Sequence, residues 1–248
     1  MTDVHDRIRE FWDRDSATYD HSASHSVSDP LEAAAWRAAL RRALPEPPAT
    51  VLDVGAGTGS LSLLAAELGY RVTALDLSEG MLGKAREKAD STGFEMSFQV
   101  GSAMSPPEGP FEAVMERHVL WTMPDPVGAL RGWREVIAPG GRLVLFEGVW
   151  GSRAPAARAK HVLADVARRV MGFADHHHAP YPDEVLAALP MARMPSPVPL
   201  VDAVYAAGWT GLRIQRLRDV EWAARLHEPW PLGWLEHLPR YALIADRP

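Results

Sequence analysis

Residues 51–59, VLDVGAGTG, constrain the fold of this chain more than any other stretch. The first four residues are mostly apolar, which is typical of a strand buried on both faces. Gly55, Gly57 and Gly59 follow, and glycine can adopt a positive φ and let a ligand approach the backbone closely. Apolar residues then recur at helical spacing from 61 to 68. A strand, a glycine turn and a helix in this order predict the start of a nucleotide-binding βαβ unit.

The next strand carries an acidic residue near its end. Residues 71–77, RVTALDL, predict that strand, and Asp76 lies about 20 residues after the first glycine. A carboxylate at this spacing can accept hydrogen bonds from both hydroxyls of a ribose. The glycine turn and the strand-end acid together are a more specific signal than a glycine motif alone.

The spacing of the glycines separates two classes of ligand. Dinucleotide-binding folds carry G-x-G-x-x-G, whereas this chain has G-x-G-x-G preceded by Asp53 within the strand. A buried charge is costly unless it is paired, so we expect Asp53 to have a partner. This pattern resembles motif I of the class I S-adenosylmethionine (SAM)-dependent methyltransferases of the small-molecule type. In that family the motif cradles the amino-acid end of the cofactor.

Later segments match the same family in order. The segment FWDRDSATYD, the strand that begins at Phe111 and the PGG turn before RLVLFEG all resemble family segments. The resemblance implies an α/β, Rossmann-like fold: a seven-stranded, mostly parallel sheet with helices on both faces and one antiparallel strand near the end. We expect a single methyltransferase domain. Its parts are a helical N-terminal cap (1–48), a SAM-binding core (49–150), a lid insertion before the last strands (151–199), and a C-terminal helix and strands of the core (200–248).

Local signals set further element boundaries. Apolar spacing predicts a helix over 4–15, and Asp29 followed by Pro30 predicts the start of a helix over 30–44, with Leu31 on its apolar side. Strands are predicted over 94–100 and 211–217, and 222–226 is interpreted as an extension of the latter. Residues 227–237 are predicted as a loop against the lid, and 241–246 as the last strand.

The resemblance implies which residues hold the cofactor. Ser102 stands where the family commonly has an acid that meets the adenine amino group, and Tyr19 would lie near the methionine end. Arg117 and His118 would lie beside the sulfonium. The predicted cofactor-binding residues are Tyr19, Asp53, Gly55, Gly57, Gly59, Asp76, Leu77, Met81, Ser102, Ala103, Met104 and Arg117.

Histidines are the candidate catalytic residues because their pKa lies near neutrality. His118 follows the fourth strand, at the edge where parallel sheets bind ligands, and His25 lies in a polar stretch before the second helix. His118 is the first candidate for a base and His25 the second; the alternative for either is a structural hydrogen bond. The predicted substrate-binding residues are Trp12, His21, Trp121, Glu147, Trp150, His178 and Tyr181.

A run of histidines at 176–178 raises the question of a metal. Imidazole is a common ligand, but three neighbouring side chains cannot converge on one ion from regular structure. The chain has no cysteine, and no clearly spaced carboxylate completes a site. We therefore predict no metal ion, and a lid or surface role for these histidines.

The charge of the chain argues against one class of partner. The chain has 248 residues, a net charge of −6 and a pI near 5.9, which do not fit a general nucleic-acid surface. The N-terminus is too charged for a signal peptide, and no apolar run reaches the ~20 residues of a membrane span. We expect a cytoplasmic monomer or homodimer that acts on a small molecule, without nucleic acid or membrane.

The resemblance implies methyl transfer from SAM by in-line displacement, with S-adenosylhomocysteine as the product. The expected acceptor is an aromatic or heterocyclic metabolite of natural-product biosynthesis, methylated at nitrogen or oxygen, and a carbon or thiol acceptor stays open. Proximity would supply much of the catalysis, and a histidine would assist where the acceptor must lose a proton. Two alternatives stay open at this point: a nicotinamide-dependent oxidoreductase and a non-catalytic SAM-binding protein.

Overall fold

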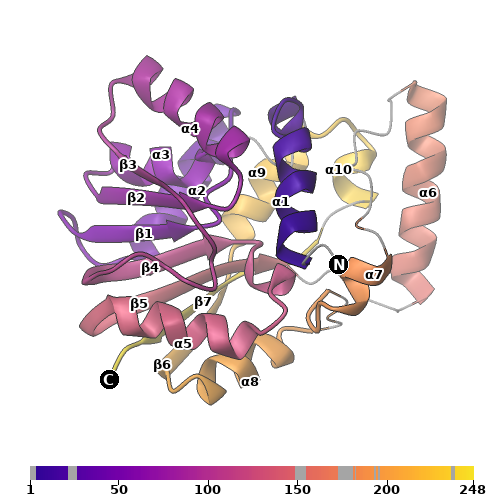
Figure 1. The fold of residues 1–248 in the computed structure, drawn as a ribbon. Coiled ribbons are helices and arrows are strands. Elements are labelled where there is room, and N and C mark those ends of the chain that lie inside the picture. Colours follow the sequence, from indigo (N-terminus) through magenta and orange to yellow (C-terminus); the bar gives the residue numbers. More distant parts are fainter. Residues whose placement is uncertain are drawn as a thin grey trace.

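The computed structural model describes residues 4–21, 27–148, 155–172, 181, 183–192, 194, 196–235 and 238–248. Its centre is a seven-stranded sheet in the order β3-β2-β1-β4-β5-β7-β6, in which β7 runs antiparallel to both of its neighbours (Figure 1). The strands are β1 (Thr50–Val54), β2 (Arg71–Asp76), β3 (Ser97–Val100), β4 (Phe111–Arg117), β5 (Ile137–Gly148), β6 (Thr210–Arg216) and β7 (Arg240–Asp246). The predicted α/β fold, with one antiparallel strand near the end, is confirmed.

Helices cover both faces of this sheet, and α1 stands between the sheet and α6 (Figure 1). The α-helices are α1 (Val4–Asp15), α2 (Pro30–Ala43), α3 (Ser60–Glu67), α4 (Glu79–Thr92), α5 (Pro126–Val136), α6 (Pro155–Met171), α7 (Asp183–Ala187), α8 (Val198–Ala206), α9 (Arg218–His227) and α10 (Leu232–Leu235). Two short 3-10 helices are η1 (Tyr19–His21) and η2 (Leu120–Thr122). None of the helices in the described ranges combines the length and the apolar composition needed to cross a membrane.

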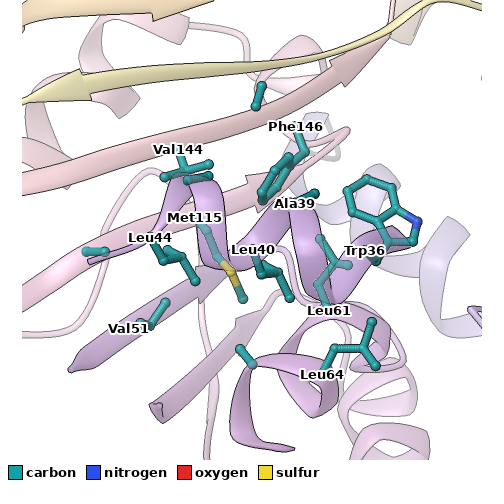
Figure 2. Close-up of a cluster of buried hydrophobic side chains, with 14 of the residues drawn as sticks. Trp36, Ala39, Leu40, Leu44, Val51, Leu61, Leu64, Met115, Val144 and Phe146 are labelled. Atoms are coloured by element: carbon teal, nitrogen blue, oxygen red, sulfur yellow. The ribbon is translucent and has the colours of Figure 1, made fainter. Parts of the chain in front are cut away.

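One face of the sheet packs against α2, α3 and α9. Trp36 and Leu40 of α2 lie over Met115, Val144 and Phe146 of the central strands (Figure 2). The rings of Trp36 and Phe146 meet edge to face, with centroids 5.4 Å apart. Burial of each of these side chains contributes about 1.5–3 kcal/mol to the free energy of unfolding. The second helix of the predicted N-terminal cap therefore supplies central side chains of the core.

The opposite face packs against α5 and α8. Trp133 of α5 is fully buried, and its Nε1 donates to the carbonyl of Ala103, 2.7 Å away. Trp209 donates in the same way to the carbonyl of Leu130, at 3.2 Å. These two bonds satisfy the buried indole donors. The bond from Trp133 also ties the loop that follows β3 to α5, which fixes one wall of the ligand edge.

The predicted start of α2 at Asp29 and Pro30 is confirmed, and side-chain caps also begin α4 and α5. Asp29 accepts hydrogen bonds from two backbone N–H groups at the start of α2, and Ser78 accepts from Met81 N at the start of α4. Asp125 accepts from Gly128 N at the start of α5. Each side chain satisfies a backbone donor that the helix leaves unpaired.

The predicted strand extension over 222–226 is wrong, because these residues belong to helix α9. Val220 and Ala223 lie three residues apart and are both buried, and α9 packs against α2. Glu221 is also buried, where its carboxylate accepts from Arg216 Nε and from Arg240 N, both at 2.9 Å. A helix lets these three residues face the body of the protein, whereas a strand would alternate them.

Three smaller expectations also differ from the structure. Leu31 is 49% exposed, because α2 turns Trp36, Leu40 and Ala43 toward the sheet instead. The third strand begins at Ser97 and not at residue 94. The predicted loop over 227–237 contains the short helix α10, which packs against α6 in the predicted lid region.

Candidate functional site

The carboxyl ends of β1, β2, β4 and β5 meet at one edge of the sheet, where the glycine turn after β1 also lies. Gly55 and Gly57 have φ angles of 65° and 56°, in the left-handed region that favours glycine. A Cβ at Gly55 would lie 2.3 Å from a methyl carbon of Val119, so glycine lets the loop after β4 pack onto the turn. A Cβ at Gly57 would meet nothing within 4 Å, which leaves the turn open toward a ligand.

A pocket beside this turn joins side chains from separate parts of the chain. Tyr19 comes from η1, Asp53 from β1 and Arg117 from the end of β4. The remaining lining residues are Gly55, Ala56, Gly57, Thr58, Ser60 and Leu61. Predicted cofactor residues from the first third of the chain and from β4 therefore meet at one place. Gly59 lies just outside the lining and forms the left-handed cap of α3.

Asp76 lies at the end of β2, directly across from the turn. Its carboxylate accepts from Gly57 N and from Ser78 N, both at 2.8 Å. Burial raises the pKa of Asp76 to about 6, and the hydrogen bonds from Ser78 and Gly57 oppose that rise. The carboxylate is therefore held by backbone donors at the position where a ribose diol would be recognised.

Asp53 has the partner that its burial requires. It is 3% exposed, and its carboxylate accepts from the hydroxyl of Ser62, one turn into α3. Burial raises the pKa of Asp53 to about 7, and the Ser62 hydrogen bond and the charge of Arg117 oppose the rise. Sequence reasoning missed Ser62, although a serine within the apolar run LSLL was a usable signal.

The loop after β3 lies next to Asp76, because Gly101 N donates to the Asp76 carbonyl at 2.9 Å. Within this loop the Ser102 hydroxyl accepts from Met104 N at 3.1 Å, and the Ala103 carbonyl is held by α5. The structure thus brings the predicted adenine-side residues beside the ribose-side acid.

Two other predicted cofactor residues, Leu77 and Met81, have different surroundings. Leu77 packs with the cluster between α1 and α7, and the Met81 side chain is buried in α4.

His118 has an unusual backbone and a buried acidic partner. Its φ is 62°, the one positive φ of a non-glycine residue in the described ranges, and its N–H donates to the Phe146 carbonyl at 3.2 Å. Its Nδ1 lies 3.3 Å from Oε2 of Glu147, which is 2% exposed. The imidazole itself is 25% exposed, so it can meet both a buried acid and a bound molecule. A left-handed backbone at a bulky residue costs about 1–3 kcal/mol, which directs attention to function.

Glu116 lies one strand away from Glu147 and was not predicted as a site residue. It is fully buried, and its Oε2 accepts from Val119 N at 2.6 Å and Leu120 N at 3.3 Å. Burial raises the pKa of Glu116 to about 8. Burial and the nearby Glu116 carboxyl raise the pKa of Glu147 well above its usual range. Through these two bonds Glu116 fixes the turn that carries His118. The sequence signal that could have identified Glu116 is an acidic residue within an apolar strand, as at Asp53.

An aromatic cluster closes the site on the side of α1. Tyr181 lies 4.7 Å from Phe11, 5.8 Å from Trp121 and 6.0 Å from Trp12, measured between ring centroids. Trp12 also meets Tyr19 at 5.8 Å, so the cluster adjoins the pocket. The predicted substrate residues Trp12, Trp121 and Tyr181 therefore share one cluster. Burial raises the pKa of the Tyr181 hydroxyl, so this group stays protonated.

Some predicted residues cannot be placed. His25, Trp150 and His178 lie outside the described residues, as does the side chain of His21 in η1. Across the described ranges, no group of three or more histidine, aspartate or glutamate side chains could hold a metal ion.

The site fits SAM on the evidence of its own geometry. The turn at Gly55 and Gly57 is a cradle with positive φ, and part of it has no room for a Cβ. Asp76 follows at the end of the adjacent strand, and the pocket places Asp53 and Arg117, of opposite charge, close to the turn. A zwitterionic amino-acid group and a ribose need this set of partners.

Comparisons with known proteins agree with this fit. Residues 52–145 match a family model described as a methyltransferase domain. The ubiquinone biosynthesis O-methyltransferase of Xanthomonas campestris pv. campestris is 33% identical over 226 residues, which cover 89% of this chain and 80% of that protein.

Solved structures show the same fold. SpnF, a cyclase, superposes with a TM-score of 0.66 at 18% identity. The match covers 100% of this chain and 97% of the SpnF chain. Phosphoethanolamine N-methyltransferase 2 of Haemonchus contortus, in complex with S-adenosylhomocysteine, superposes with a TM-score of 0.65 at 14% identity. The match covers 100% of this chain and 61% of the Haemonchus contortus chain. These matches argue against the alternative of a nicotinamide-dependent oxidoreductase. The chain belongs to the class I SAM-dependent methyltransferases, and SAM is its cofactor.

Proposed function

We propose that this enzyme methylates the hydroxyl oxygen of a small aromatic or heterocyclic metabolite, with His118 as the base and Glu147 as its positioning partner. The observation that carries the proposal is the His118–Glu147 pair, which lies at the ligand edge of the sheet next to the pocket that contains Arg117. The sequence relative named above, at 33% identity, is an O-methyltransferase, which favours oxygen over nitrogen as the acceptor atom.

The cofactor would be held by residues of the glycine turn and of the neighbouring strands. Asp76 would accept from the ribose hydroxyls, and the loop at Ser102 would face the adenine. Asp53 would pair with the ammonium group of the amino-acid end and Arg117 with its carboxylate, with Tyr19 as the cover. Bound SAM supplies an activated methyl group, which a nucleophile displaces in line.

The chain's own residues would then position the acceptor and remove its proton. Fixing the acceptor at near-contact distance can contribute about 7–11 kcal/mol to catalysis. A hydroxyl becomes a better nucleophile as its proton passes to His118, and an oriented base contributes roughly 10²–10⁴ in rate. Glu147 holds the imidazole through Nδ1 and stabilises the cation that forms when Nε2 takes the proton.

The aromatic cluster supports a flat acceptor. Phe11, Trp12, Trp121 and Tyr181 come from α1, from the loop after β4 and from the region before α7. Nε1 of Trp121 is buried and has no hydrogen-bond partner within the described residues, so it is suited to donate to an oxygen of a bound molecule. Such walls favour an aromatic ring with polar substituents. Natural-product biosynthesis remains our proposal for its source.

The test is a screen of phenols, catechols and anilines with SAM, followed by His118→Ala on the best acceptor. We expect kcat to fall at least about 100-fold while the Kd for S-adenosylhomocysteine changes less than about twofold. Equal turnover by the variant and the wild type would remove His118 from the mechanism. Turnover restricted to anilines would show that nitrogen is the acceptor atom.

A further inference from the structure

The segment that covers the cofactor pocket is attached to the core by acidic side chains. After α1 ends at Asp15, the chain turns and η1 places Tyr19 in the pocket wall. The next residue, Asp20, reaches across to the glycine turn. Its Oδ1 accepts from the hydroxyl of Thr58 at 2.7 Å, and its Oδ2 pairs with Lys88 Nζ of α4 at 2.7 Å.

The three side chains form a closed set. Lys88 Nζ also donates to the backbone carbonyl of Thr58, at 3.0 Å. Thr58 lines the pocket and is 1% exposed, whereas the side chains of Asp20 and Lys88 are 28% and 33% exposed. The hydrogen bond between Asp20 and Thr58 is therefore buried on the Thr58 side. Solvent ions can reach the ion pair between Asp20 and Lys88.

A second attachment holds the other side of the same segment. Asp13 Oδ1 accepts from the Ser78 hydroxyl and from Gly80 N, just past the predicted ribose acid. The approach is close, because a Cβ at Gly80 would lie 2.7 Å from Ser16 Oγ. The covering segment is thus fixed to α4 at one end and to the glycine turn at the other. The attachment at Asp20 includes an ion pair with Lys88 that is partly exposed to solvent.

We propose that Asp20 is a positioning residue for the cofactor: with Thr58 and Lys88 it clasps Tyr19 over the glycine turn and slows the release of the bound nucleoside. This proposal rests on the cofactor placement given under the proposed function. It is separable from the catalytic part, because it concerns the rate of ligand exchange and not the chemistry at His118.

The expected effects follow from the strengths of these contacts. Asp20→Asn keeps the shape but removes the charge, so it loses the ion pair and weakens a charge-assisted hydrogen bond. We expect S-adenosylhomocysteine to dissociate about five- to tenfold faster. Lys88→Met removes the partly exposed ion pair and the hydrogen bond to the Thr58 carbonyl, and we expect about a two- to fivefold increase. Raising salt from about 50 to about 500 mM should speed release from the wild type more than from Lys88→Met.

The experiment is surface plasmon resonance with the immobilised 248-residue chain and S-adenosylhomocysteine as the probe. Lys84→Met is the matched control, since Lys84 lies on the same helix and pairs only with nearby Glu87 in the contacts that the structure gives for it. This control should keep the wild-type dissociation rate. Thermal unfolding of each ligand-free variant separates a loss of clasping from a loss of folding.

A double-mutant cycle tests the specific bond. If Asp20 acts through Thr58, the combination of Asp20→Ala with Thr58→Val should dissociate the probe little faster than the single variant Asp20→Ala, which can no longer accept from the Thr58 hydroxyl. Unchanged dissociation from folded Asp20→Asn, or effects of Asp20 and Thr58 that multiply, would overturn the clasp. Failure of the wild-type chain to bind the probe would overturn the cofactor placement as well, whereas normal binding with unaltered rates would overturn the clasp alone.

Discussion

The buried carboxyl of Asp53 should lower the free energy of unfolding of the ligand-free protein. The carboxyl is buried in β1 with the Ser62 hydroxyl as its hydrogen-bond donor, and burial raises its pKa from 3.8 to about 7. Between these values the unfolded chain has released a proton that the folded protein still holds. The free energy of unfolding therefore falls as the pH rises through this window, and it stays low above the folded pKa.

The size of the effect follows from the same two pKa values. A rise from 3.8 to about 7 corresponds to about 4 kcal/mol, at about 1.4 kcal/mol for each tenfold change. Asparagine has the same shape and never ionises, and its carbonyl can still accept from Ser62. Because the structure around a charged Asp53 relaxes in part, we expect Asp53→Asn to raise the free energy of unfolding by about 2 kcal/mol at pH 8.5.

The assay is thermal unfolding of the ligand-free wild type and Asp53→Asn at about pH 8.5 and about pH 4.5. For a chain of this length we expect the variant to unfold about 4–8 °C higher at the upper pH. Only about a quarter of that gain should remain at the lower pH, because pH 4.5 lies just above the unfolded pKa of 3.8 and little of the window between the two pKa values has been crossed. Ser62→Ala is the control, and its loss of the donor should lower stability at pH 8.5.

Two results would refute this reasoning. An equal gain at both pH values would mean that the charge of Asp53 is not its cause, and a loss of stability at pH 8.5 would mean that the ionised carboxylate is well solvated. The same variant should also bind SAM about tenfold more weakly if Asp53 pairs with the ammonium group of the cofactor. A residue that lowers stability but improves ligand binding is expected at a functional site.

Three further predictions follow from the site. Asp76→Ala should weaken S-adenosylhomocysteine binding at least about 10-fold by calorimetry, since it removes the acceptor for the ribose; unchanged affinity in a folded variant would contradict the assignment. Gly55→Ala should cost about 2–3 kcal/mol in urea unfolding because its Cβ meets Val119, whereas Gly140→Ala, with a similar φ of 75° and open space, should cost about 1 kcal/mol. Because the pKa of Glu147 is raised, the activity of the wild type should rise as the pH rises through that raised pKa, and Glu147→Gln should lower kcat and remove that rise; an unchanged profile would exclude Glu147 from the proton transfer.

The cofactor half of the site could be predicted because its signal is local. The strand, the glycine turn, the helix and the second strand are contiguous in sequence, and each boundary has a chemical cause. Gly55 and Gly57 adopt positive φ, and Ser78 caps the following helix. Asp76 needs only the geometry of two adjacent parallel strands to reach Gly57 N. No long-range contact has to be guessed for this part.

The partners of these residues could not be predicted in the same way. His118 and Glu147 were both candidates, but their pairing depends on the register between β4 and β5, in which Arg117 lies opposite Phe146. Asp20 meets Thr58 and Lys88 only because a turn after α1 crosses the glycine loop. Sequence patterns report which face of an element is buried, and they do not report which side chains from distant elements meet there.

The acceptor half of the site shows why the substrate is harder to infer than the cofactor. The walls proposed for it come from Trp12 of α1, from Trp121 after β4 and from Tyr181 before α7, three segments with no common sequence spacing. An aromatic residue in any of them is equally consistent with an ordinary core, so only the fold distinguishes the two. The cofactor site serves one molecule and keeps one pattern, whereas the acceptor site can change by replacing a few side chains on α1 and α7. The test of acceptor specificity therefore belongs at Trp121, whose buried Nε1 has no partner within the described residues. Trp121→Phe should leave S-adenosylhomocysteine binding intact and raise the KM for the acceptor.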